Sequence, residues 1–308
     1  MATEATDTTG PSEKARGLVR GAYDLHVHIA PDVPPRRIDD VALAQRCSEV
    51  GLAGFGLKSH YTSTAERAQI VSAAVPGVRA IGTLTLNWAV GGMNPLAVEV
   101  AAREGARIVW MPTVDSPAET AGRREPQPGD KVPQWAKLQH ELRELGFSIE
   151  AVEVTDADGQ LLPETRLVLE TVARHDLILA TAHLGRDDTF AVVDGAFAAG
   201  VKTVVITHPE FTCQNFSIED QVALADRGCL IERCLTTPYS GKTTYEHVFD
   251  GVRAVGVERN FFSSDCGNPG YPPVEDGLAI WADELLGAGF SEDDVGLVIV
   301  EGSRRLVA

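Results

Sequence analysis

The sequence predicts one α/β domain, a (β/α)8 TIM barrel, on three observations. Short apolar runs alternate with longer amphipathic stretches, which is the pattern of parallel strands joined by crossover helices. Eight such runs can be counted, the number of strands in this kind of barrel. The third observation is that side chains suited to metal binding stand at the ends of several runs.

The apolar runs are the predicted strands. In chain order they cover residues 22–28, 53–60, 78–87, 106–115, 176–184, 202–209, 228–235 and 259–265. The stretches between them carry the residues that begin and end helices. Helices are predicted over 95–105, 164–175 and 217–228, and from 291 onward. Asn94-Pro95 and Ser217 are typical of helix starts, since Asn and Ser cap a first turn and Pro fits its first position.

The domain boundaries follow from the same pattern. Residues 1–20 are polar and predict a flexible N-terminal tail, and residues 21–308 predict a single barrel domain. The segment FSIEAVEVTDADGQLLP (147–163) does not fit the alternation. It reads as a strand, a turn at Asp158-Gly159 and a return strand, so we expect a β-hairpin insertion outside the barrel.

Two loops are long and rich in Gly, Pro and charge, 115–134 and 265–275. Both follow the carboxyl ends of predicted strands, which is the face where barrel enzymes place their active sites. We therefore expect these loops to act as lids or to set specificity.

Composition limits the classes of partner. The chain has 308 residues, 44% hydrophobic, with 27 Lys and Arg against 44 Asp and Glu, a net charge of −17. That charge repels nucleic acid and anionic membrane surfaces. No apolar run approaches the roughly 18 residues that span a bilayer. The five cysteines have no CxxC spacing, so we expect reduced thiols and a cytoplasmic protein. The partner that remains is a small-molecule substrate, and homo-oligomers are left open.

His26 and His28 stand two residues apart at the end of the first predicted strand. Because side chains alternate along a strand, both point to the same side, here the barrel interior. His183 ends the fifth run, His208 the sixth and Asp265 the eighth. Five ligand-type residues on four strand ends meet near the barrel axis, so the pattern predicts a metal site.

These residues resemble a known family. The His-x-His on the first strand, single histidines on the fifth and sixth, and the Asp on the eighth look like the amidohydrolase superfamily of metal-dependent TIM-barrel hydrolases. The stretches DLHVHIAPD and SSDCGNPGYPP resemble a group of small, poorly characterised single-barrel members. The resemblance implies a barrel fold and a hydrolase that uses a divalent metal, Zn foremost, with Mn or Fe as alternatives.

One departure from that superfamily concerns the residue that bridges two metals. Its binuclear members usually bring a carboxylated Lys or a Glu from the fourth strand, or a Glu from the third, but here the fourth run ends WMPTVD. Lys58, at the end of the second strand, is the substitute that the sequence offers. Three interpretations stay open for it: a carbamylated bridge, a charged anchor for substrate, or a structural residue.

Other polar residues near strand ends are predicted to contact substrate. They are His60, Asn87, Glu232 and Arg233, with His60 also open as a second-metal ligand. Lys58, Arg36 and Arg37 near strand-end loops suggest an anionic substrate. The remaining histidines, at 140, 175 and 247, lie on predicted helices or helix ends and are interpreted as surface residues.

The predicted chemistry is metal-assisted hydrolysis. A divalent ion lowers the pKa of a bound water to about 7, Asp265 takes and returns the proton, and the metal or His208 polarises the attacked carbonyl. His26, His28, His183 and Asp265 suffice for one metal, and His208 and a modified Lys58 join for two. The expected substrate is a small amide, cyclic amide, lactone or related ester. A decarboxylase of the same superfamily and a phosphoesterase are the alternatives.

Overall fold

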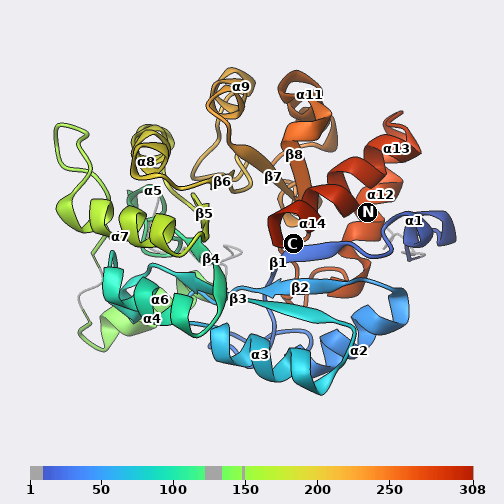
Figure 1. The fold of residues 1–308 in the computed structure, drawn as a ribbon, viewed down its shortest axis with the longest axis horizontal. Coiled ribbons are helices and arrows are strands. Elements are labelled where there is room, and N and C mark those ends of the chain that lie inside the picture. The colour runs from blue at the N-terminus through green and yellow to red at the C-terminus, as the bar shows by residue number, and fades with distance from the viewer. Residues whose placement is uncertain (1–9, 122–133, 148–149, 308) are drawn as a thin grey trace, which may run out of the picture.

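A barrel of parallel strands forms the centre of the molecule (Figure 1). The computed structural model describes residues 10–121, 134–147 and 150–307. The strands are hydrogen-bonded in chain order: β1 (Tyr23–Val27), β2 (Gly54–Leu57), β3 (Arg79–Thr85), β4 (Ala106–Trp110), β5 (Ile178–Ala180), β6 (Thr203–Ile206), β7 (Leu230–Cys234) and β8 (Asn260–Ser263). Each lies within one predicted run, which confirms the predicted (β/α)8 barrel.

Helices surround the strands (Figure 1). They are α1 (Glu13–Leu18), α2 (Asp40–Val50), α3 (Ala65–Ala74), α4 (Pro95–Arg103), α5 (Pro117–Ala121), α6 (Gln134–Glu144), α7 (Pro163–Arg174), α8 (Arg186–Ala199), α9 (Ile218–Asp226), α10 (Thr236–Tyr239), α11 (Tyr245–Val255), α12 (Gly277–Gly287), α13 (Glu292–Val295) and α14 (Gly302–Val307), with a π-helical segment Gly296–Glu301 and short 3₁₀ turns at Trp88–Val90, Val257–Arg259 and Val274–Asp276. Within the described residues, none of these helices is both long and apolar enough to cross a membrane.

The predicted helix starts carry the expected caps. The Asn94 side chain accepts hydrogen bonds from the backbone N–H groups of Leu96 and Ala97 at the start of α4. Ser217 accepts one from Asp220 at the start of α9, and Ser291 makes a reciprocal capping box with Asp294 at α13. These bonds satisfy N–H groups that a first helical turn leaves without partners.

The N-terminal segment is more ordered than a flexible tail over 1–20. Residues 13–18 form α1, and Ala15 on this helix is buried. The Ser12 hydroxyl donates a 2.6 Å hydrogen bond to the Asp283 carboxylate on α12. Apolar burial and this bond attach the helix to the barrel, while residues 1–9 of the predicted tail lie outside the described residues.

The expected hairpin insertion is present in a reduced form. One antiparallel bridge joins Thr155 to Leu161, and Gly159 closes the turn between them by donating to the Asp156 carbonyl. The preceding Val152 and Val154 are buried against the barrel without a ladder. Residues 148–149 of this segment and 122–133 of the first predicted lid lie outside the described residues.

An irregularity in β1 decides which of its residues enter the barrel. The pairing of β1 with β2 shifts between Asp24 and Val27. Leu25 lines a cavity inside the barrel, while Val27 packs in the outer apolar cluster. Such a bulge places two neighbouring residues on one side, so Leu25 and His26 both face inward.

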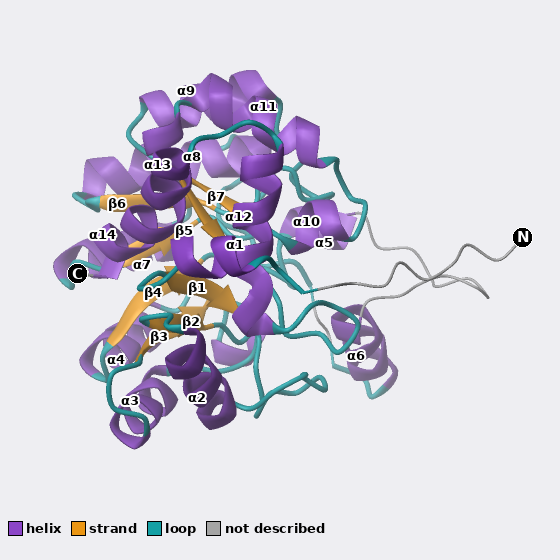
Figure 2. Cartoon of the chain, turned by 90° about the vertical axis from the view of Figure 1, so that its right-hand side faces the viewer, coloured by secondary structure: helices purple, strands orange, loops and turns teal. Residues whose placement is uncertain are grey.

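The amino-terminal end of the barrel is covered by α14. The Ser303 hydroxyl on this helix accepts from the Tyr23 backbone N–H at the start of β1 (3.0 Å). The Arg79 side chain at the start of β3 donates to the Val307 carbonyl (2.6 Å). Figure 2 shows α14 at one end of the strands and α5 and α10 at the other, where the strands end.

The barrel closes between β1 and the residues that follow β8. The Asp265 backbone N–H donates to the His26 carbonyl, and the His28 N–H donates to the Cys266 carbonyl, both at 2.8 Å. The Asp24 carboxylate accepts from the Ser264 N–H at 2.9 Å. The residues on either side of Asp265 are therefore fixed to the strand that carries both histidines.

Gly267 allows this close approach, and replacing it should destabilise the barrel. Its φ is +134°, and a Cβ there would stand 1.6 Å from the His28 carbonyl oxygen. We expect Gly267→Ala to lower the free energy of unfolding by about 2–4 kcal/mol through strain and overpacking, as measured by denaturant unfolding. Gly270→Ala is the control in the same loop, since its Cβ meets nothing nearer than 3.6 Å. Equal stability of both variants would contradict this role.

Asp24 should give the fold a pH dependence. Burial raises the pKa of its carboxyl from 3.8 to about 7, so the native state holds a proton that the unfolded chain releases. The stabilisation of the native state by this proton is complete below about pH 4 and is lost as the pH rises toward 7. From pH 5 to 8 we expect wild type to lose about 2–3 kcal/mol relative to Asp24→Asn. Asp158→Asn, in an exposed turn, should show no such difference.

Candidate functional site

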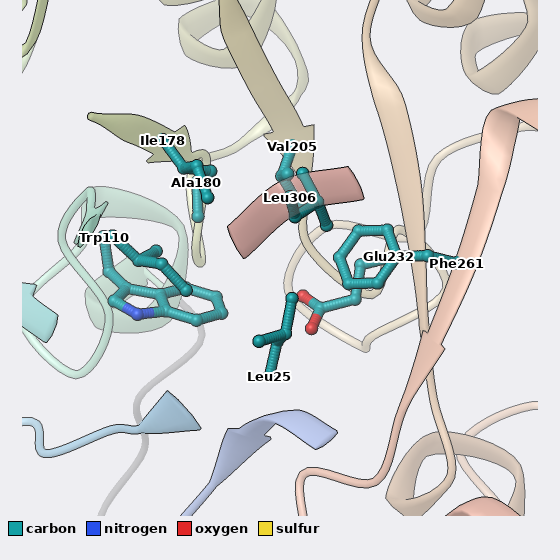
Figure 3. Close-up of a pocket in the computed structure, with 9 residues that line it drawn as sticks. Leu25, Trp110, Ile178, Ala180, Val205, Glu232, Phe261 and Leu306 are labelled. Atoms are coloured by element: carbon teal, nitrogen blue, oxygen red, sulfur yellow. The ribbon is translucent and has the colours of Figure 1, made fainter. Parts of the chain in front are cut away.

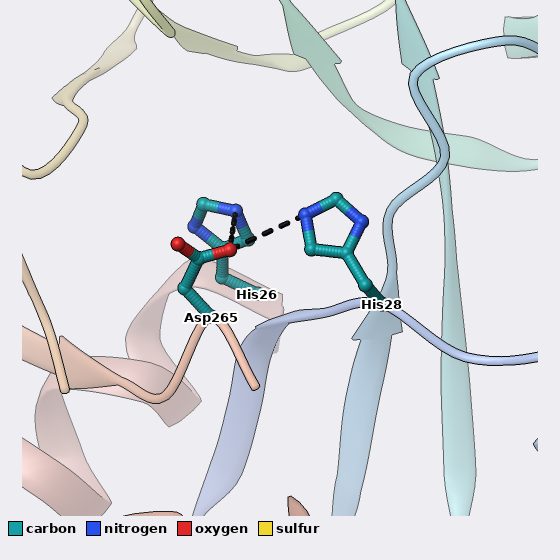
Figure 4. A group of neighbouring side chains, drawn as sticks. All are labelled: His26, His28 and Asp265. Atoms are coloured by element: carbon teal, nitrogen blue, oxygen red, sulfur yellow. Dashed lines mark ion pairs between the residues drawn. The ribbon is translucent and has the colours of Figure 1, made fainter. Parts of the chain in front are cut away.

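Three ligand-type side chains meet where β1 and the end of β8 come together (Figure 4). The Oδ1 atom of Asp265 lies 3.1 Å from Nε2 of His26 and 3.2 Å from Nε2 of His28. One donor atom from each residue lies within 4.8 Å of the other two. Both imidazoles are buried. The structure therefore brings together three of the residues that the sequence predicts as metal ligands.

The other two predicted histidines continue this cluster. The ring centroids of His183 and His208 lie 5.0 Å apart, and that of His208 lies 5.9 Å from that of His26. His60 stacks on His28 with the centroids 4.7 Å apart. The histidines from four strand ends thus form one continuous group at the carboxyl end of the barrel.

Three of these imidazoles are oriented by an acceptor behind them. The Nδ1 atom of His26 lies 3.2 Å from Glu232 Oε1, that of His183 2.8 Å from Glu119 Oε1, and that of His208 2.8 Å from Gln214 Oε1. A carboxylate or amide oxygen in this position holds the ring proton on Nδ1 and leaves the Nε2 lone pair for a cation. The donor set therefore fits a divalent metal of the kind that imidazole and carboxylate ligands hold.

His28 differs from the other three. Its Nδ1 atom lies 3.3 Å from the Arg36 guanidinium, which Asp32 in turn binds at 2.7 Å. A guanidinium only donates, so the ring proton of His28 stands on Nε2 and points to Asp265. Binding of a cation at His28 Nε2 requires this hydrogen bond from Arg36 to be released.

Lys58 lies at the middle of the cluster. It directly follows β2 and is buried, with its Nζ atom 2.9 Å from Nε2 of His26 and 4.0 Å from the ring centroid of Trp110. Burial lowers the pKa of its ammonium, and the carboxylates of Asp265 and Glu232 oppose this effect. Lys58 therefore supplies the positive charge nearest to His26.

The protonation of the cluster follows from burial and from these charges. Burial lowers the pKa of His28, His183 and His208 below the ordinary value, which favours the neutral ligand form. Burial and Lys58 also lower the pKa of His26, but Asp265 and Glu232 outweigh them and raise it.

Asp265 is ionised, and its two carboxylate oxygens have different partners. Burial would raise its pKa, but His26 and His28 hold it well below the usual range. Its Oδ2 atom accepts a 2.8 Å hydrogen bond from the Thr236 hydroxyl on α10. Its φ of +55° lies in the left-handed region, which costs free energy and often marks a functional position.

His60 and Asn87 lie in a shared hydrogen-bond group beside the cluster. The Nδ1 atom of His60 lies 2.8 Å from the Thr113 hydroxyl, and the Asn87 amide donates to the same hydroxyl and to the His60 carbonyl. The Asn87 side chain also accepts from the backbone N–H of Thr113. Asn87 is buried and connects the ends of β2, β3 and β4, so its contacts are structural, while His60 remains next to His28.

Glu232 and Arg233 lie on opposite faces of β7. Glu232 points inward to His26 and also accepts from the Ser263 hydroxyl at 2.6 Å. Arg233 points outward, where it pairs with Glu210 and donates to Gln221 (2.7 Å) and Asn260 (2.9 Å). The structure therefore does not bring Arg233 to the cluster, because side chains alternate along a strand and its neighbour occupies the inner face.

A small apolar cavity lies inside the barrel (Figure 3). Among the residues that line it are Leu25, Trp110, Phe261 and Leu306, together with the Glu232 carboxylate. Within the described residues, the Oε2 atom of Glu232 has no hydrogen-bond partner. The same carboxylate thus faces both this cavity and the imidazole of His26.

Several residues of the site carry no signal in the sequence. Glu119 and Gln214 hold His183 and His208; Glu119 lies on the short helix α5 and Gln214 in a loop. Thr236 begins the short helix α10, and none of these three segments is long enough to show a periodic apolar pattern. Glu119 falls in the loop 115–134 that was expected to be a lid. A second group of ligand-type atoms, from Glu119, His183 and Cys213, also lies within 4.8 Å. The one sequence feature that indicates Glu119 is its place in the segment 115–134, which follows the carboxyl end of the fourth predicted strand.

Solved structures share this architecture. An amidohydrolase from Pseudomonas aeruginosa is 14% identical, with a TM-score of 0.61 over 95% of this chain and 97% of its own. The probable dipeptidase PvdM from the same organism is 12% identical, with a TM-score of 0.62 over 96% of both chains. A triple mutant of an organophosphorus hydrolase from Deinococcus radiodurans is 16% identical, with a TM-score of 0.52 over 100% of this chain and 99% of its own. They confirm the resemblance in fold to amidohydrolase barrels.

Sequence comparison identifies the family. No curated protein matches the chain. Residues 21–232, more than half of the chain, match the model of a family of unknown function, DUF6282. That range begins just before β1 and ends within β7, so it contains all five histidines of the cluster. The chain therefore belongs to the family DUF6282.

Proposed function

We propose that this protein is a metal-dependent hydrolase of small molecules. The observation that carries the proposal is the donor set at the end of the barrel. Asp265 lies against His26 and His28, and three imidazoles of the cluster have an acceptor behind Nδ1. Isolated core histidines need no such arrangement, whereas histidines that bind a metal almost always have it.

The residues that would hold the metal are His26, His28, His183, His208 and Asp265, with Lys58 as a carbamylated bridge if two ions bind. Zinc suits this mixture of imidazole and carboxylate, and manganese or iron are the alternatives. Carbamylation would turn the buried ammonium of Lys58 into an anionic ligand, which suits its place 2.9 Å from the Nε2 atom of His26.

The chain's own residues supply the acid and base. A divalent ion, when bound, supplies a Lewis acid and makes water a nucleophile near neutral pH. Asp265, ionised and fixed by Thr236, accepts the proton of the attacking water and returns it to the leaving group. The predicted polarisation of the attacked carbonyl by His208 does not fit its surroundings, because burial keeps the ring neutral and Gln214 accepts its Nδ1 proton, so Nε2 can serve as a ligand but not as a hydrogen-bond donor. Phe211, packed on His183 and His208, excludes water from that side.

The proposed substrates are small amides, cyclic amides, lactones or related esters. The names of the compared structures, an amidohydrolase and a dipeptidase, support this class. A decarboxylase could use the same residues, and release of carbon dioxide without consumption of water would replace the hydrolase proposal. All five cysteines are free thiols in the structure, which supports the proposal of a cytoplasmic, reducing location.

Metal content tests the donor set. In buffer with zinc and bicarbonate we expect two ions per wild-type chain and one in Lys58→Ala, because the bridging ligand is lost. The measurement is elemental analysis of dialysed protein, with Lys202→Ala, a surface residue paired with Asp176, as the control. One ion in both proteins would assign Lys58 to substrate binding. If wild-type protein retains no metal after dialysis, the proposed metal site is wrong.

Asp265 should be essential for turnover. A panel of lactones, cyclic amides and nitrophenyl esters identifies a cleaved substrate, with uptake of oxygen from labelled water as proof of hydrolysis. We expect Asp265→Asn to lower kcat by at least about a hundredfold, since general acid–base catalysis contributes roughly 10²–10⁴-fold. The control variant is Asp32→Asn, which removes the charge of a carboxylate that pairs with Arg36. Full activity of Asp265→Asn would exclude the assigned role.

A further inference from the structure

Lys242 places a positive charge at the mouth of the site. It lies between α10 and α11, and its Nζ atom stands 4.5 Å from the ring centroid of Phe211. That ring in turn packs 4.8 Å from the ring of His208 and 5.1 Å from the ring of His183. One aromatic side chain therefore separates the Lys242 ammonium from two of the proposed ligands.

The other cations near the cluster are already engaged. Arg36 is paired with Asp32, Lys58 contacts His26, and Arg37 donates to two backbone carbonyls at the exposed rim. Within the described part of the chain, Lys242 makes no ion pair, although acidic residues outnumber basic ones by 44 to 27. An unpaired ammonium beside a proposed active site is available to a ligand.

The surroundings of Lys242 strengthen this argument. Although the residue as a whole is exposed, protein atoms around its ammonium remove hydration and lower its pKa, against the attraction of the Asp265 and Glu119 carboxylates. Both carboxylates belong to the cluster, so a cation bound there would neutralise part of their negative charge. The attraction of Lys242 for an anion would then increase.

We propose that Lys242 binds a carboxylate of the substrate and so selects an acidic amide, lactone or ester. This inference rests on the proposed function, because the scissile carbonyl is placed at the histidine cluster. A single ammonium matches the single charge of a carboxylate, whereas a phosphate dianion is usually held by several cationic donors. Lys242 is therefore a specificity residue for the acid group.

Two activated esters test this selection in the zinc-loaded protein. Mono(para-nitrophenyl) glutarate carries a carboxylate at the far end of its acyl chain, and para-nitrophenyl butyrate does not. We expect Lys242→Met to raise KM for the glutarate ester by about tenfold or more, with kcat little changed and with KM for the butyrate ester unaltered. Lys242→Arg should keep most of the preference, and Lys202→Met, on the outer surface, is the matched control.

Binding without turnover separates this inference from the proposed function. We expect glutarate to raise the melting temperature of wild type and of Lys242→Arg, but not of Lys242→Met, while neutral glutaramide has no effect on any of them. If neither ester is cleaved and glutarate still binds through Lys242, the hydrolase proposal loses support and the acid site stands. If the esters are cleaved alike in wild type and Lys242→Met, or if glutarate does not bind wild type, the inference is overturned.

Discussion

The closure of the barrel between β1 and the end of β8 is the constraint on which the site depends. Two backbone hydrogen bonds, from Asp265 to His26 and from His28 to Cys266, place the carboxylate against both imidazoles. The same backbone bonds that complete the fold therefore set the geometry of the proposed metal ligands. Backbone hydrogen bonds that continue past the ends of the strands give the site this precision, which is why a barrel can hold ligands from distant parts of a chain.

A second constraint is the presence of charged side chains inside the barrel. The cluster holds the buried carboxylates of Glu232 and Glu119 and the partly exposed carboxylate of Asp265, with Lys58 as a buried cation beside His26. Buried charges are costly unless they are paired. Lys58 against His26 and Trp110 provides part of that pairing in the protein alone, and a metal would provide more. The arrangement is thus suited to a cation in its own right, independent of the substrate.

The sequence predicted the strands and the positions of His26, His28, His183, His208 and Asp265 because apolar runs and terminal polar residues are local signals. It could not decide between Glu232 and Arg233, since both stand at one strand end and only the sheet shows which faces inward. Asn87 was expected to contact substrate, but its amide serves the backbone of neighbouring strands. The sequence does not indicate Glu119, on the short helix α5, or Lys242, in a loop, because both gain their neighbours only through tertiary structure.

The position of α14 has a consequence for how the protein can be handled. This helix seals the base of the barrel through Ser303 and Val307, and Figure 2 shows it at the end of the strands away from α5 and α10. A fluorophore or surface linkage attached to α14 would leave from the side opposite the histidines. Immobilisation through that end would therefore keep the mouth of the barrel open to dissolved molecules.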